Sequence, residues 1–417
     1  MSEETTKLVG GRRKAALGFI FATALMDVTA LGLMIPVLPN LVKEMAGGDF
    51  AQATVITGYF SLCWGILQLF CSPIQGMLSD RFGRRPVLLI SIFGLGIDYL
   101  FMALSPTLAW LFVGRLINGV TSASFSTAGA YVADITEPKD RAKSFGLMGA
   151  AFSLGFIIGP VIGGFLGDIS LRLPFYVSAG LALVNWLYGY FILPESLPPE
   201  RRAARFDWKK ANPFGSFKLL QSHHELLGLA SITFLFQLAH NVFPAIFVLY
   251  TGYRFGWSPR DVSLMLLCTG LASATVQFLL VKPIVQRLGE RGALIVGLIS
   301  GIAGFAVYAV ASTPQVFVMG IPVFALAALV GPSNQALMSQ RVGPREQGQL
   351  QGANGAIQSI TSIIGQVMFT QTFAWVIRHH ATLSFPGLPM MVASALMAGA
   401  LLFAFRVAKP VREPLAA

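Results

Sequence analysis

The sequence predicts an all-α membrane protein with twelve transmembrane helices, arranged as two six-helix bundles. Its 417 residues are 54% hydrophobic and only 12% charged, whereas soluble domains carry about 25% charged residues. Twelve apolar segments are separated by mostly short polar loops, and each approaches or exceeds the roughly 20 residues that cross a bilayer as a helix. Residues of the first half also recur 206 positions later, so we expect two equivalent bundles in tandem.

The apolar runs place the spans in order along the chain. They are residues 15–39, 52–75, 86–105, 108–133, 143–167, 173–193, 226–250, 261–283, 292–311, 315–338, 348–377 and 388–406. We expect the first span to continue uncleaved to Pro39, because few apolar residues precede the small residues at 22–24 that imitate a cleavage site. Residues 194–225 are rich in Pro and charge and predict a cytoplasmic linker. The N-terminal bundle is then 1–193 and the C-terminal bundle 226–417.

The internal repeat is clearest in one cytoplasmic loop and one helix of each half. The matched pairs are Arg81 and Arg287, Gly83 and Gly289, Arg85 and Arg291, and Gly159 and Gly365. Because each half holds six spans, an even number, both repeats enter the membrane from the same side. Parallel repeats of this kind are typical of secondary transporters.

The net charge of +11 orients the chain in the membrane. Most Lys and Arg residues fall in the N-terminus, the loops on one side, the linker and the C-terminus. This positive-inside pattern places both termini in the cytoplasm and argues against a nucleic-acid partner. Cys63, Cys71 and Cys268 all lie within spans and predict neither a disulfide framework nor a metal site.

Three strongly ionising side chains lie deep within the spans: Asp27, Asp98 and Arg115. A charge at the bilayer centre costs about 2.5–3.5 kcal/mol on insertion scales, so each needs a reason. Their similar depths permit an Asp–Arg pair. Such a pair would fix helix packing, or one carboxylate would alternate between a proton and a cationic substrate. His240 in the seventh span has the same two interpretations, as a proton carrier or as a hydrogen-bonded packing residue.

Four stretches resemble the major facilitator superfamily and its drug–proton antiporters. GMLSDRFGRRPVLL at 76–89 resembles the signature loop after helix 2. LGLMIPVLPNL at 31–41, LFVGRLINGV at 111–120 and GFIIGPVIGG at 155–164 resemble antiporter motifs of helices 1, 4 and 5. Within the superfamily the chain looks most like bacterial tetracycline-efflux transporters, by Asp27, Gln68, Asp98 with Tyr99, and the EQGQLQG run at 346–352.

The resemblance implies a proton-coupled antiporter that exports a tetracycline-like or other lipophilic drug by alternating access. It also implies the bacterial cytoplasmic (inner) membrane, a small-molecule substrate, no cofactor, no metal, and the proton gradient as energy source. We expect a monomer embedded in the lipid bilayer. An uptake carrier or facilitator of the same fold is the alternative. An intramembrane enzyme is disfavoured, because the chain has no HExxH motif and no nucleophile–base set.

The helices that line the central cavity in this superfamily define the expected site. Residues assigned to proton coupling are Asp27, Asp98, Arg115 and His240. Residues assigned to substrate binding are Asp27, Gln68, Arg115, Asn118, Gln237, His240, Asn241, Asn334 and Gln335. The chain departs from the tetracycline transporters at Ser273 and Gly301, where they carry a functional His and an Asp. Tetracycline as substrate and an identical proton pathway therefore do not follow from the resemblance.

Two further motifs have a structural and a functional interpretation. The cytoplasmic residues expected to form a conformational latch are Gly76, Asp80, Arg81, Gly83, Arg84, Arg85, Asp134 and Arg141. Their charges also serve to orient the loop. Gly155, Gly159, Pro160, Gly163 and Gly164 predict a closely packed, kinked face of the fifth span rather than a ligand site.

Overall fold

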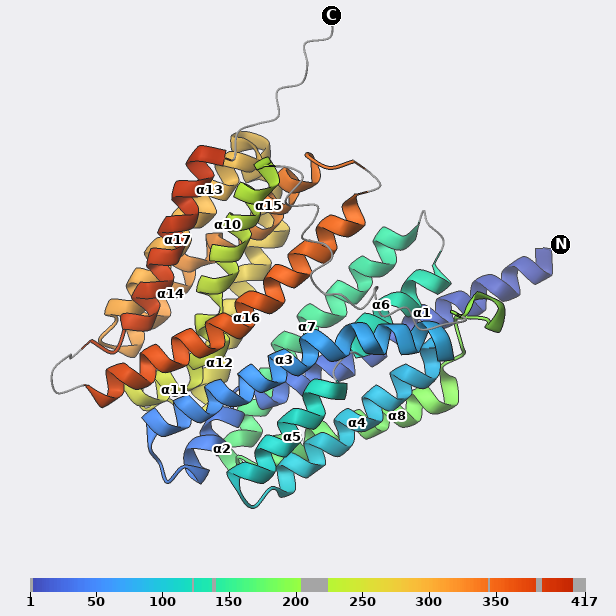
Figure 1. Ribbon diagram of the computed structural model, residues 1–417, viewed down its shortest axis with the longest axis horizontal. Coiled ribbons are helices and arrows are strands. Elements are labelled where there is room, and N and C mark those ends of the chain that lie inside the picture. The colour runs from blue at the N-terminus through green and yellow to red at the C-terminus, as the bar shows by residue number, and fades with distance from the viewer. Residues whose placement is uncertain are drawn as a thin grey trace, which may run out of the picture. The chain divides into compact units, whose positions relative to one another are not determined.

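The computed structural model describes residues 3–121, 124–136, 140–203, 224–343, 346–379 and 385–407, and all regular secondary structure in them is helical (Figure 1). The helices of the first half are α1 (Glu3–Met34), α2 (Leu38–Met45), α3 (Phe50–Phe82), α4 (Arg84–Leu104), α5 (Leu108–Thr121), α6 (Ser124–Ile135), α7 (Arg141–Ile169), α8 (Leu173–Ile192) and the 3₁₀ turn η2 (Pro199–Arg201). Those of the second half are α10 (His224–His240), α11 (Val242–Phe255), α12 (Pro259–Thr275), the π turn η4 (Val276–Leu280), α13 (Val281–Val310), α14 (Pro314–Ala325), the 3₁₀ turn η5 (Leu326–Leu329), α15 (Val330–Ser339), α16 (Gln347–Arg378) and α17 (Leu388–Val407).

These helices account for the twelve predicted crossings. Ten helical stretches of the described residues are long and apolar enough to span a membrane, and Leu108–Thr121 is a shorter apolar helix. The stretch Pro259–Val310 has 52 residues, and Gly289 with φ 68° interrupts it, so it makes two crossings. The all-helical membrane fold predicted from composition and periodicity is confirmed.

Several spans break at prolines, which the apolar pattern did not locate. The first helix does not continue to Pro39: α1 ends at Met34, because Pro36 lacks an N–H and disfavours helix in the residue before it. The seventh span divides into α10 and α11 at Asn241, where the ring of Pro244 conflicts with the carbonyl of His240. The tenth span passes through η5 ahead of Pro332.

The chain divides into two compact units. The first contains α1, α2, α4–α8, residues 63–82 of α3 and the short segment Ser258–Leu264. The second contains Gly48–Leu62, α10, α11 and the helices from Met265 onward. The bundle boundaries at 193 and 226 stay a prediction.

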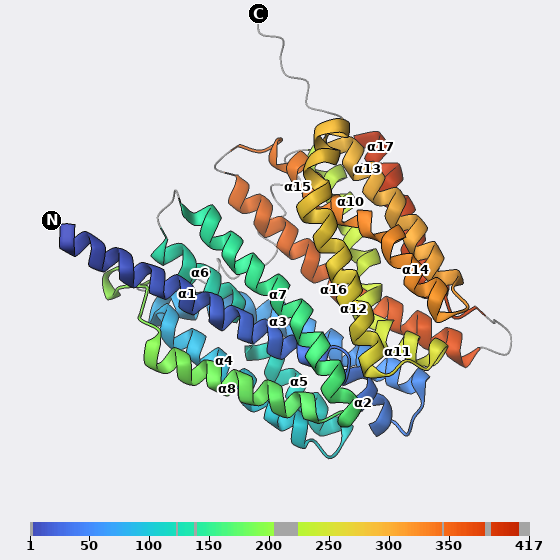
Figure 2. The ribbon, with the colours of Figure 1, turned by 180° about the vertical axis from the view of Figure 1, so that it is seen from behind.

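In the first unit, α7 lies along α1 (Figure 2). A Cβ added at Gly159 would lie 2.7 Å from the Gly32 Cα and 2.7 Å from the Thr29 carbonyl oxygen, so backbone meets backbone here. Gly155 lies equally close to Val28, and Gly163 lies against Leu33. Close approach of this kind drives helix association where no water is present.

The second unit repeats this arrangement. A Cβ at Gly365 of α16 would lie 2.6 Å from the Asn241 Cβ, at the junction of α10 and α11. The two loop glycines of the repeat also match, since Gly83 has φ 105° and Gly289 has φ 68°. Only glycine adopts such values without strain, so the same loop geometry occurs in each half.

Candidate substrate and proton sites

A buried polar cluster joins three helices of the first unit. Asp98 of α4 is 0% exposed, and Asn118 and Arg115 of α5 are 1% and 8% exposed. Trp64 Nε1 of α3 donates to Asn118 Oδ1 at 2.8 Å, and Asn118 Nδ2 donates to Asp98 Oδ2 at 2.7 Å. The Arg115 guanidinium lies 5.4 Å from the centroid of the Trp64 ring. This is a continuous chain from an aromatic ring to a carboxyl group.

The direction of this chain is fixed by chemistry. An indole nitrogen can only donate, so Asn118 must present its oxygen to Trp64 and its nitrogen to Asp98. Asp98 Oδ2 is therefore always an acceptor. Its other oxygen, Oδ1, has no hydrogen-bond partner among the described residues. A proton bound by Asp98 would consequently reside on Oδ1.

Arg115 lies near Asp98 and over the ring of Trp64. Asp27 lies on α1 and is 3% exposed. Gln68 lies partly exposed on α3, one turn after Trp64. Sequence reasoning identified Asp98, Arg115 and Asn118 but missed Trp64. A tryptophan in an apolar span is usually interpreted as a packing residue. Only its indole N–H group indicates a polar role.

An amide-rich pocket of about 280 Å³ lies in the second unit. Its walls are α10, α15 and α16, and its lining residues are Thr233, Phe236, Gln237, Val330, Gly331, Asn334, Gln335, Gln351, Asn354, Gly355 and Gln358. No member of this set is ionisable. The predicted residues Gln237, Asn334 and Gln335 are brought together here. Gln351, Asn354 and Gln358 were missed, although their spacing along α16 places them on one helix face.

Hydrogen bonds fix two of these amides. Asn334 Nδ2 donates to the Leu229 carbonyl oxygen at 2.9 Å and to Thr233 Oγ1 at 2.8 Å. Asn354 Nδ2 donates to Gln335 Oε1 at 2.6 Å. The pocket walls are thus cross-linked between α10 and α15 and between α15 and α16, while carboxamide groups still line the cavity.

His240 lies in an aromatic setting at the end of α10. Its ring stacks with those of Phe236 and Phe324, at centroid distances of 5.8 and 6.1 Å, and meets Phe243 edge-on at 5.4 Å. It is exposed and follows Phe236 and Gln237 by four and three residues, on the helix face that lines the amide pocket. Asn241 instead donates its Nδ2 to the Gln237 carbonyl oxygen at 2.8 Å.

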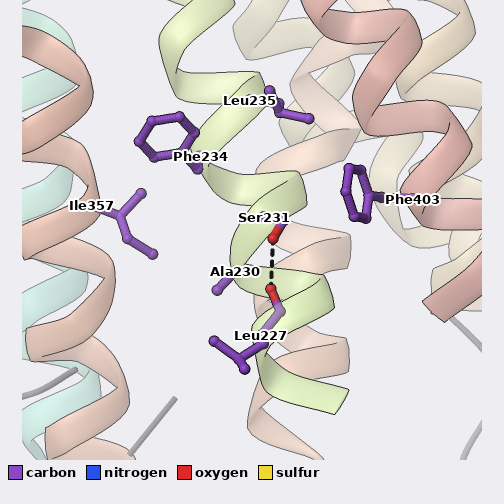
Figure 3. A pocket seen from close by; sticks show the side chains of 7 residues that line it. All are labelled: Leu227, Ala230, Ser231, Phe234, Leu235, Ile357 and Phe403. Carbon is purple, nitrogen blue, oxygen red and sulfur yellow. Dashed lines mark hydrogen bonds between the residues drawn. The ribbon is translucent and has the colours of Figure 1, made fainter. Parts of the chain in front are cut away.

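A second, apolar pocket of about 370 Å³ lies on another side of α10 (Figure 3). Its lining residues are Leu227, Ala230, Ser231, Phe234, Leu235, Ile357 and Phe403. The hydroxyl of Ser231 is engaged with the Leu227 carbonyl oxygen at 2.9 Å, as Figure 3 shows. This pocket presents hydrocarbon, whereas the amide pocket presents hydrogen-bonding groups.

The signature loop is held within the first unit by the ion pairs and hydrogen bonds of Arg84, which we call the bracket around Arg84. Arg84 is paired with Asp80, bonds Asp134 Oδ2 at 2.9 Å and donates to Ser79 Oγ at 2.8 Å. The Asp80 side chain is 52% exposed and that of Asp134 is 23% exposed. The bracket thus ties α3 and α4 to α6, and every one of these bonds is internal to one unit.

Sequence reasoning missed Glu195, which follows α8 and completes this bracket. Its carboxylate accepts from the backbone N–H groups of Arg84 and Arg85 at the start of α4, at 2.9 and 3.3 Å. The position is favourable because a helix N-terminus has free N–H groups and a positive dipole end. Gly83 lies against Glu195, so a side chain there would collide with the carboxylate.

The remaining latch residues make other contacts. Arg85 Nη2 donates to the Tyr190 carbonyl oxygen at 2.6 Å, and the Arg81 guanidinium lies 5.4 Å from the Phe82 ring centroid. Open space surrounds Gly76 where a Cβ would point. The side chain of Arg141 lies outside the described residues.

The fifth-span motif packs on more than α1. Ser263 Oγ donates to the Pro160 carbonyl oxygen at 2.6 Å, and Gly164 lies directly against Ser263.

Gly301 is packed against the Met397 methyl group, with Ala327 Cβ 3.6 Å from where its own Cβ would be. A larger side chain at position 301 would require the Met397 side chain to move.

Comparison with known proteins identifies the family. The model of the Major Facilitator Superfamily matches residues 18–366. The chain belongs to this superfamily. It is 39% identical to a class C tetracycline resistance protein of Escherichia coli, over 86% of this chain and 90% of that protein. It is 31% identical to multidrug resistance protein 2 of Bacillus subtilis, over 81% and 84%.

Solved structures show the same fold. The human organic anion transporter TETRAN matches with a TM-score of 0.69 and 23% identity, over 94% of this chain and 99% of that one. The nucleoside transporter NupG matches with a TM-score of 0.72 and 15% identity, over 95% and 100%. The major facilitator fold of two six-helix bundles is confirmed, and the chain is a multi-pass membrane transporter.

Proposed function

We propose that the chain is a proton-coupled antiporter that exports a tetracycline-like drug from the bacterial cytoplasm by alternating access. The observation that carries the proposal is the buried Asp98, with one oxygen hydrogen-bonded and the other without a hydrogen-bond partner among the described residues. A carboxyl group so deep in a span is costly unless it has a function. Similarity to tetracycline and multidrug resistance proteins supports the direction of transport and the class of cargo.

The hydrogen-bond chain provides a route from protonation to structure. A proton on Asp98 Oδ1 removes the negative charge near Arg115 and weakens the charge-assisted bond from Asn118. Because Asn118 also holds Trp64, the change is transmitted to α3. Asp27 on α1 is the second carboxyl group that we assign to proton coupling. His240, which is exposed and packs against three phenyl rings, is assigned to the substrate side.

The amide pocket supplies the substrate contacts of the second unit. Its lining offers donors and acceptors but no charge, so it suits hydroxyl, carbonyl and carboxamide groups. We further propose that the protein needs no cofactor, acts as a monomer in the inner membrane and has both termini in the cytoplasm. The linker at 194–225 then joins the bundles on the cytoplasmic side.

Transport in proteoliposomes tests the proposal. Purified protein is reconstituted, a pH gradient is imposed, and uptake of tetracycline, ethidium and norfloxacin is followed. We expect concentrative movement opposite to the proton flux, abolished by a protonophore. Equilibration that a protonophore does not change would instead support the alternative, a facilitator or uptake carrier.

A further inference from the structure

The apolar pocket lies along one side of the first turns of α10. Its residues on this helix are Leu227, Ala230, Ser231, Phe234 and Leu235. They recur at intervals of three and four, so they form a single stripe. Figure 3 shows Phe234 directed toward Ile357 of α16 and Leu235 directed toward Phe403 of α17. The floor of the pocket is therefore α10, its walls are α16 and α17, and its surface is hydrocarbon.

The first unit has a different arrangement at the matching place. At the offset of 206 residues, Phe234 corresponds to Val28 and Thr361 corresponds to Gly155. A Cβ added at Gly155 would lie 2.7 Å from the Val28 Cβ, so α7 closes directly onto α1. The second unit has larger side chains at both positions. They replace the close glycine contact, and α16 leaves the apolar pocket open beside α10.

The apolar pocket extends over the depth of about one lipid leaflet. From Leu227 to Leu235 the helix rises by about 12 Å at 1.5 Å per residue. Half of a hydrocarbon core of about 30 Å is about 15 Å. Leu227 lies in the first turn of α10, so the pocket begins near the membrane surface and ends toward the midplane. In the orientation that we propose, this surface is the cytoplasmic one.

Positive charge is concentrated at the surface end of the apolar pocket. Arg406 is exposed in the last turn of α17. Arg291 Nη2 donates to the Phe405 carbonyl oxygen at 3.1 Å, which places a second guanidinium at the same helix end. The acid at the start of α10, Glu225, is paired with Arg341 at 2.9 Å. A basic site beside an apolar pocket at the cytoplasmic surface matches the two parts of an anionic phospholipid.

We propose that the second unit binds one anionic phospholipid of the cytoplasmic leaflet at this place. An acyl chain lies in the apolar pocket, and Arg406 and Arg291 bind the phosphate group. The inference goes beyond the export function and does not depend on which compound is transported. Inside a bilayer every lipid offers hydrocarbon, so selection of this lipid comes from the arginines, while the pocket fixes where its chain lies.

Native mass spectrometry of the full chain with added dioleoyl phosphatidylglycerol tests the pocket. We expect one lipid to bind more tightly than those that follow, and Ser231→Phe to lose this lipid because the ring fills the pocket. Ser153→Phe is the matched control. Ser153 of α7 is exposed, donates to the Gly149 carbonyl oxygen at 3.0 Å as Ser231 does to that of Leu227, and lines neither pocket. Loss of the tight lipid in both variants, or in neither, overturns the proposal.

The head group is tested by a second pair of variants. Arg406→Gln should weaken binding of dioleoyl phosphatidylglycerol about fivefold, the value of one arginine beside an anionic lipid, and leave dioleoyl phosphatidylcholine unaffected. Arg378→Gln is the control, because Arg378 is also exposed in the last turn of its helix. It ends α16, which crosses the membrane in the opposite direction to α17. Equal affinity of the wild type for the two lipids would contradict the assignment of the arginines.

Measurements on the wild type keep the proposal testable if Ser231→Phe does not fold. Dihexanoyl phosphatidylglycerol has the same head group but chains too short to fill the pocket, so it should bind more weakly, and equal affinity overturns the proposal. Saturating tetracycline should leave lipid binding unchanged, whereas competition would make the pocket part of the drug site. A dimer that dissociates as the lipid binds would show that a second copy covers the pocket. Either result also overturns the proposal.

Discussion

At the scale of single residues, Asp98 is the group to which we assign proton coupling. The fixed direction of the chain from Trp64 through Asn118 leaves only Oδ1 free to bind a proton. In Asp98→Asn the amide oxygen can take the place of Oδ2 and the NH₂ group the place of a protonated Oδ1. The variant therefore imitates the permanently protonated carboxyl group.

We expect Asp98→Asn to keep substrate binding and substrate exchange but to lose concentrative transport driven by a pH gradient. Counterflow and gradient-driven uptake, measured in the same proteoliposomes, separate the two activities. Asp168→Asn is the control, because Asp168 is an exposed acid that accepts a hydrogen bond from the Arg260 backbone. Gradient-driven accumulation by Asp98→Asn at the wild-type rate would remove Asp98 from the coupling mechanism.

His240 leads to the opposite expectation, because its ring packs against the rings of Phe236, Phe243 and Phe324. His240→Phe should retain the ratio of accumulated substrate to imposed pH gradient, while the affinity for substrate changes by about threefold, the size of one altered ring contact. Titration calorimetry gives the affinity and proteoliposome uptake gives the ratio. A collapse of the ratio would return His240 to the proton pathway.

At the scale of helices, composition and periodicity were sufficient for the fold, because a bilayer requires long apolar helices and little else competes with them. Helix breaks were not predictable, since a proline such as Pro244 is tolerated in many spans and its effect depends on neighbouring helices. Some polar site residues, such as Asp98, Arg115 and Asn334, were identified one by one. Their grouping was not, because the face that each helix presents is decided by tertiary packing, as Trp64 and Asn354 show.

The contact of α7 with α1 predicts a difference between two glycines of the same helix. Gly159→Ala places a methyl group 2.7 Å from the Gly32 Cα and should destabilise the protein by about 1–3 kcal/mol, as overpacking does. Gly149→Ala meets nothing within 4 Å and should be neutral or slightly stabilising. Thermal unfolding midpoints in detergent give the comparison. Equal midpoints for the two variants would show that the helices separate freely at this contact.

At the scale of the whole molecule, the bracket around Arg84 limits which bonds can control alternating access. A bond present in both facing states contributes equally to each and cannot change their ratio. The bonds from Arg84 to Asp134 and Ser79 are internal to one unit, so we assign them to rigidity. Asp80 differs, because its side chain is 52% exposed and remains available to a further donor.

We therefore predict that Asp80→Asn shifts the balance of facing states and slows turnover while equilibrium binding stays nearly unchanged, whereas Asp134→Asn lowers stability without a shift. Spin labels at Glu200 and Gly343, both exposed, report the populations by double electron–electron resonance in a background without the native cysteines. Both variants remove one carboxylate from the same arginine, so a general loss of charge would affect them alike. Only a bond made in one facing state produces a distance change confined to Asp80→Asn. Unchanged distance distributions together with normal transport in Asp80→Asn would leave this loop with its topogenic role alone, because no two-state element would then depend on its charge.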